Sequence, residues 1–88
     1  MATTSVTPSG NAYTKANAND VPCFLEVAEP GMIRVIVSGT GLPPAGSGTY
    51  HLIKYPGGVF SYGGNQEVYV RNHVSGAATV KVVVTEVI

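Results

Sequence analysis

The stretch at residues 78–88 reads Ala-Thr-Val-Lys-Val-Val-Val-Thr-Glu-Val-Ile, and it decides the fold class. In an extended chain successive side chains point to opposite faces, so Val80, Val82 and Val84 share one face while Lys81 lies on the other. β-Branched residues favour strands because their stiff side chains pack well on a pleated surface. The stretch therefore predicts the strongest β-strand of the chain.

The same strand is also apolar on its second face, where Val83 and Val87 lie before the final Ile88. A strand that is apolar on both faces needs cover on both, and an exposed apolar edge is prone to aggregate. Two explanations stay open. The strand is central in its own sandwich, with Val83 and Val87 under the N-terminal segment, or it is buried against another chain. Val83, Val87 and Ile88 are therefore candidate interface residues.

Upstream of this strand, turn residues separate further stretches in which apolar and polar side chains alternate. These predicted strands cover residues 23–29, 32–37, 49–55, 59–62 and 67–74. Glu29-Pro30-Gly31 suits a type II turn, since proline presets φ at its second position and glycine accepts a positive φ at its third. This turn predicts a hairpin between the first two strands. Ser75-Gly76 predicts another tight turn, before the last strand.

The remaining segments read as loops, apart from one short strand near the N-terminus. Residues 1–22 are rich in Thr, Ser, Asn and Ala, and they predict a strand over 3–7, ended by Pro8, and a loop over 9–20. Residues 38–48 hold four glycines and two prolines and predict the longest loop. We expect one all-β domain of 88 residues, an antiparallel β-sandwich or small barrel of six to seven short strands without a long helix. Within it, residues 1–22 form an N-terminal arm or an edge strand.

Charge is the most informative bulk property. Charged residues make up 11% of the chain and the net charge is zero, against roughly 25% charged residues in ordinary soluble domains. A freely diffusing monomer usually keeps its net charge away from zero, so this composition favours assembly. The five basic residues are scattered singly, which argues against a nucleic-acid partner because phosphate binding needs clustered Lys or Arg.

The residues that carry catalysis or bind metals are sparse. Cys23 is the only cysteine, which excludes an intrachain disulfide, and with His51 and His73 it does not give zinc-ligand spacing. No serine lies in a nucleophile elbow, and Gly39-Thr40-Gly41 lacks the lysine of a phosphate-binding loop. We expect no enzyme activity, no cofactor and no metal. No apolar run resembles a signal peptide or a membrane span, so we expect synthesis in a cytoplasm without a membrane partner.

Five aromatic residues lie among glycines in the second half of the chain: Tyr50, Tyr55, Phe60, Tyr62 and Tyr69. Tyrosines offer large contact area and a polar tip, so they suit a recognition surface. They also suit a core that lacks tryptophan. The pattern favours core positions for Tyr50 and Phe60 and leaves Tyr55 and Tyr62 open. Tyr55, Phe60 and Tyr62 complete the set of candidate interface residues.

Residues 43–86 carry a family resemblance. Its segments are Pro43-Pro44-Ala45, Tyr50-His51-Leu52, Pro56-Gly57-Gly58-Val59-Phe60, Val68-Tyr69-Val70-Arg71 and the run at 76–86. In these segments the chain resembles small β-sandwich proteins encoded among the head and tail structural proteins of tailed bacteriophages. The resemblance implies a virion component, such as a capsid decoration protein, a cementing protein or a head-fibre base.

We therefore expect a non-catalytic structural protein of a bacteriophage virion. It would be made in the host cytoplasm, form a homo-oligomer (dimer or trimer) and bind a major capsid or tail protein. The alternative is a carbohydrate- or ligand-binding β-sandwich whose exposed rings Tyr55, Phe60 and Tyr62 stack on the ligand. A surface adhesion module is a third possibility.

Overall fold

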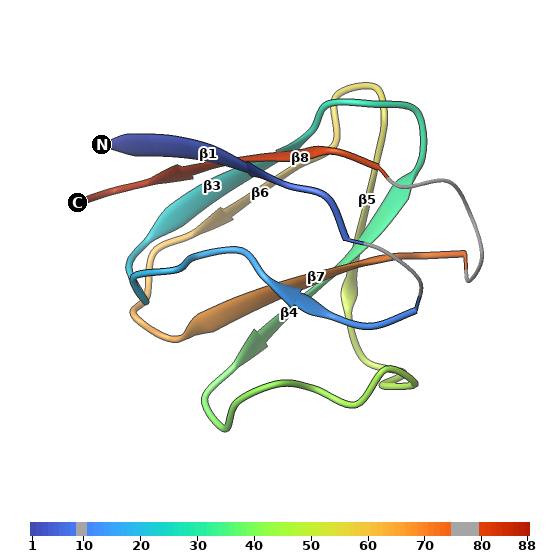
Figure 1. The fold of residues 1–88 in the computed structure, drawn as a ribbon, viewed down its shortest axis with the longest axis horizontal. Coiled ribbons are helices and arrows are strands. Elements are labelled where there is room, and N and C mark those ends of the chain that lie inside the picture. Colours follow the sequence, from blue (N-terminus) through green and yellow to red (C-terminus); the bar gives the residue numbers. More distant parts are fainter. Residues whose placement is uncertain (9–10, 75–79) are drawn as a thin grey trace.

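A computed structural model of the chain describes residues 1–8, 11–74 and 80–88 (Figure 1). These ranges contain no helix, and their strands are β1 (Ala2–Val6), β2 (Thr14–Lys15), β3 (Cys23–Val27), β4 (Met32–Ser38), β5 (His51–Lys54), β6 (Val59–Tyr62), β7 (Glu67–Asn72) and β8 (Val82–Glu86). The expected count of six to seven strands was too low, because β2 was predicted as loop. Two residues are too few to show an alternating pattern.

The strands form two antiparallel sheets of four strands each. The first sheet has the order β1-β8-β3-β6 and the second has the order β2-β7-β4-β5. Pairs form between β1 and β8, β2 and β7, β3 and β6, and β4 and β5. The first strand thus pairs with the last, the second with the last but one, and so on inward. This scheme is the jelly-roll arrangement, and the expected all-β antiparallel sandwich is confirmed.

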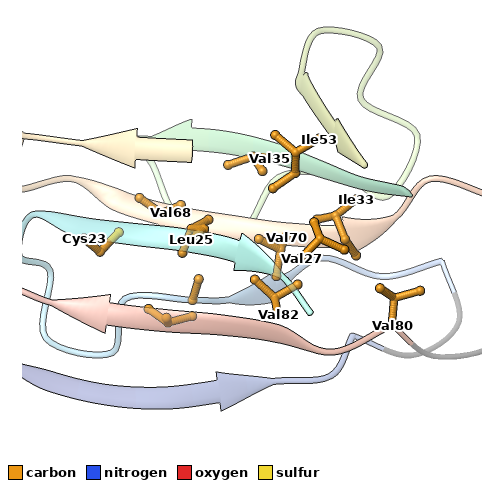
Figure 2. Packing of buried hydrophobic residues seen from close by; sticks show 12 residues of the cluster. Cys23, Leu25, Val27, Ile33, Val35, Ile53, Val68, Val70, Val80 and Val82 are labelled. Atoms are coloured by element: carbon orange, nitrogen blue, oxygen red, sulfur yellow. The ribbon is translucent and has the colours of Figure 1, made fainter. Parts of the chain in front are cut away.

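The core lies between the sheets, where one face of each strand is apolar. Leu25 and Val82 of the first sheet and Ile33, Val35 and Val70 of the second are all fully buried. Figure 2 shows members of this cluster gathered between the strands. Burying each such side chain contributes about 1.5–3 kcal/mol. The alternation that predicted the strands therefore also selects the residues that hold the two sheets together.

The predicted hairpin over residues 23–37 is wrong. β3 belongs to the first sheet and β4 to the second, so Glu29-Pro30-Gly31 carries the chain from one sheet to the other. Gly31 has φ +150°, and a Cβ there would lie 2.4 Å from a methyl carbon of Val80. Gly31 has the predicted positive φ, but residues 29–31 form a bend and φ +150° is far from the value of about +80° that a type II turn requires. Proline and glycine serve a crossing between sheets as well as a hairpin.

The C-terminal strand is central in the first sheet. β8 pairs with β1 on one side and with β3 on the other, and the chain's two ends lie next to one another (Figure 1). It covers five residues, fewer than the expected 78–88. The predicted turn at Ser75-Gly76, residues 78–79 of the predicted strand and residues 9–10 of the predicted loop lie outside the described residues.

The loop between β2 and β3 is held by buried polar side chains. Asn17 has no exposed surface; its Nδ2 donates to the carbonyls of Gln66 (2.8 Å) and Val21 (3.2 Å). Its Oδ1 accepts a hydrogen bond from the backbone N–H of Val68 at 2.7 Å. Glu86, also buried, accepts hydrogen bonds from the backbone and side-chain nitrogens of Asn19. These contacts tie the loop to both sheets.

Candidate assembly surfaces

Two of the three aromatic residues proposed as an exposed platform turn toward the core. Phe60 is half-buried, packs on the core cluster and has its ring centroid 5.1 Å from that of His51. Tyr62 is also half-buried against the core, and its Oη accepts a hydrogen bond from the backbone N–H of Gln66 at 2.9 Å. A Cβ on Gly64 would lie 2.3 Å from that Oη, so the ring lies directly over the glycine. Tyr62 thus packs over the β6–β7 connection and accepts a hydrogen bond from its backbone.

Tyr55 is the exception, because it is 43% exposed beyond the end of β5. The other two rings of the proposed set, Phe60 and Tyr62, pack against the core and are not exposed beside it. The geometry therefore brings no stacking platform together from these three residues. This placement gives the carbohydrate-binding alternative no support.

The three terminal candidates lie apart from these aromatics. Val83 is half-buried on the outer face of the first sheet, with Ser5 and Glu26 as its neighbours on the adjacent strands. Val87 and Ile88 follow β8 and are 52% and 63% exposed. The strand is thus central in its own sheet, yet the N-terminal segment does not cover Val83 and Val87.

Val83 belongs to an almost uncharged surface. The outer face of the first sheet consists of Thr3 and Ser5 from β1, Val83 and Thr85 from β8, Phe24 and Glu26 from β3, and Val59 and Ser61 from β6. Phe24 is 42% exposed and Val59 is 48% exposed. Glu26 is the single charged residue of these eight. We call this set the first outer face.

The outer face of the second sheet is basic near β5. Arg34 and Leu52 are neighbours across β4 and β5, as are Met32 and Lys54. His73 lies beside Met32, and its backbone N–H donates to the Met32 carbonyl. Among the described residues, no carboxylate lies within 4.0 Å of the charged nitrogens of Arg34 or Lys54. We call these five residues the basic patch.

The opposite end of the second sheet has its own ion pairs. Lys15 lies 2.6 Å from Asp20 and 4.0 Å from Glu67. The hydrogen bond to Asp20 raises the pKa of Lys15, and donating its hydroxyl to Glu67 raises the pKa of Tyr69. These two acids are therefore engaged locally, and they do not neutralise the basic patch.

The long loop between β4 and β5 covers part of the second sheet between these two ends. Arg71 is 4% exposed and donates from Nη1 to the carbonyl of Ala45 in this loop. At the base of the loop lies an open hollow of about 240 Å³, lined by Val35, Ile36, Val37, Thr49, Tyr50 and His51. The lining holds the imidazole of His51, the phenol of Tyr50 and no carboxylate.

In the described part of the chain, no three His, Cys, Asp or Glu side chains lie close enough together to hold a metal ion. The same residues include no helix with the length and apolarity needed to cross a bilayer.

Cys23 is buried beside Glu86, its cross-strand neighbour. Burial, and secondarily the Glu86 carboxylate, raise the pKa of the Cys23 thiol. Because burial raises the pKa, the folded state favours the protonated thiol. Below the pKa of the unfolded thiol, about 8.5, the thiol is protonated in both states and its contribution to stability is complete. That contribution is lost as the pH rises toward the folded-state pKa.

We therefore expect the difference in unfolding free energy between the parent and Cys23→Ala to be constant below about pH 8 and to shrink above about pH 9. Urea titrations of both proteins across this pH range measure it. A difference that stays level up to pH 10 would contradict a thiol shifted by burial.

The sequence reasoning missed Phe24, Val59 and the basic patch. The signal for Phe24 was present, because it alternates with the buried Cys23 and Leu25 and must point away from the core. Arg34 and Lys54 were noted only as scattered cations, since their proximity depends on the pairing of β4 with β5.

Comparison with known proteins adds no relative: no family model, no curated protein and no solved structure matches this chain.

Proposed function

We propose that this chain is a non-catalytic structural protein of a bacteriophage virion that assembles with copies of itself and binds a capsid or tail surface. The first outer face carries the proposal: a broad sheet surface with exposed Phe24 and Val59 and one charge, on a chain of zero net charge. Exposed aromatic and aliphatic side chains on a face with few charges suit a protein–protein contact, where aromatic residues are enriched and charged residues are depleted.

The jelly-roll topology adds support of a weaker kind. This arrangement recurs in viral capsid proteins, but lectins and cupins share it, so the fold does not decide between them. The inward turn of Phe60 and Tyr62 removes two of the three rings that a sugar-binding platform would use. Assembly is therefore the better-supported function.

Replacing Phe24 with Thr tests the proposal, because threonine preserves strand propensity and removes the largest exposed apolar side chain of the first outer face. We expect self-association to weaken roughly tenfold, about 1.4 kcal/mol, which is within the range for removing a buried aromatic contact. Light scattering at a series of concentrations measures it, and circular dichroism checks the fold.

Leu42→Thr is the matched control, since Leu42 is 65% exposed on the long loop and lies outside both sheets. Association of this variant should equal that of the parent. Equal association of the Phe24 and Leu42 variants would remove the first outer face from the proposal.

A further inference from the structure

The two outer faces carry opposite charge. Glu26 is exposed in the middle of the first outer face, flanked by Val83 and Val59 on the neighbouring strands. Arg34 and Lys54 lie on the basic patch, on the other side of the sandwich. The first outer face thus presents one carboxylate, with the exposed Lys81 at its edge, and the basic patch presents two cations that have no carboxylate of the described residues within 4.0 Å.

The basic patch is held in place by its neighbours. The guanidinium carbon of Arg34 lies 4.4 Å from the ring centroid of Tyr50, and Arg34 Nε donates to His73 Nδ1 at 3.1 Å. A stacked guanidinium loses less freedom when it binds a carboxylate, because its planar donors are already oriented. Arg34 thus presents a partly exposed, oriented cation for a carboxylate from outside.

The basic patch is also apolar, as the first outer face is. Met32 is 37% exposed and Leu52 is 47% exposed, and each lies beside one of the two cations. The first outer face offers Phe24 and Val59 beside Glu26. Each surface thus combines two exposed apolar side chains with charge of opposite sign, which is the pattern of complementary protein surfaces.

We propose that copies of this chain stack front to back, so that the first outer face of one copy lies on the basic patch of the next. The inference rests on the proposed function of self-assembly and assigns its two surfaces. Glu26 of one copy contacts Arg34 and Lys54 of its neighbour, and Phe24 and Val59 pack on the neighbour's apolar side chains. The contact is heterologous, because the two copies use different surfaces, so it closes a ring or continues as a filament.

The small size of the contact places it among weak, reversible associations. The four strands are spaced about 4.8 Å apart and rise about 3.3 Å per residue. Three of them have five residues and β6 has four, so the face covers roughly 300 Å². Burying two such faces lies below the roughly 1,200 Å² of stable interfaces. We therefore expect association that depends on concentration and on salt.

Charge reversal tests the stacking. Glu26→Lys and Lys54→Glu should each weaken self-association at least tenfold, because each puts like charges against each other at the contact. An equimolar mixture should associate again, since the unaltered basic patch of the first variant matches the unaltered first outer face of the second. Light scattering of each variant and of the mixture measures this, with circular dichroism to verify folding.

Lys81→Glu is the comparison, because it makes the same change in net charge as Lys54→Glu but at the edge of the first outer face, beside Val83, where an added negative charge meets the neighbour's basic patch. It should not weaken association. The stacking would be overturned if Lys54→Glu associated as well as an associating parent. It would also be overturned if the mixture stayed dissociated. Either outcome would leave the proposed function standing. A monomeric parent would instead overturn self-assembly itself.

Discussion

Replacing Asn17 with Ala is expected to lower the free energy of unfolding by about 3 kcal/mol, a large part of the roughly 5–15 kcal/mol typical of a domain. The fully buried amide makes three hydrogen bonds to the backbone, at Val21, Gln66 and Val68. Alanine would leave two carbonyls and one N–H without this partner, and each unsatisfied buried group costs about 1–3 kcal/mol before relaxation.

Urea denaturation of the Asn17 variant and of Asn65→Ala, an exposed asparagine in the β6–β7 connection, measures the effect. Asn65→Ala should lie close to the parent. Asn17→Asp keeps the acceptor for Val68 but sets an oxygen against two carbonyls, so it should be destabilised as well. Parent-like stability of both Asn17 variants would show that the loop does not depend on this side chain.

Gly58→Ala is expected to destabilise the fold by a similar amount, about 3 kcal/mol, through overpacking. A Cβ at this position would lie 2.4 Å from the backbone oxygen and 2.6 Å from the backbone nitrogen of Lys54. Backbone atoms cannot rotate away as a flexible side chain can, so the connection between β5 and β6 would have to move. That shift would also strain the hydrogen bond from the Val27 N–H to the Gly58 carbonyl.

Gly63→Ala provides the comparison for Gly58→Ala, because a Cβ on Gly63 meets nothing within 4 Å. Its thermal midpoint should stay near that of the parent. That of Gly58→Ala should fall by roughly 12–24 °C, since each kcal/mol lowers the midpoint of a domain of this size by about 4–8 °C. Equal midpoints for the two variants would contradict the close approach of Gly58 to Lys54.

The sequence predicted the strands well because alternation along one strand is a local property. Cys23, Leu25 and Val27 alternate with exposed residues, and all three are buried in the structure. Pairing between strands is not local. A proline-glycine turn fits both a hairpin and a crossing between sheets, which is why the β3–β4 connection was assigned wrongly.

The candidate surfaces were harder to predict for the same reason. Val83 was singled out correctly as pointing away from Val82 and Val84, yet whether β1 would cover it depended on the sheet order. Phe60 and Tyr62 alternate with Val59 and Ser61, and the sequence does not say which of the two faces is inward. Opposite charge on the two outer faces follows only once both sheets are known.

Solution mass is the most direct test of the central claim, that this sandwich is built to assemble with copies of itself. Light scattering of the unmodified chain, from dilute to concentrated solution, should show a mass that rises to a multiple of the 9.1 kDa protomer. Added salt should lower that mass, because opposite charges at the contact are screened. A mass of 9.1 kDa throughout would contradict self-assembly.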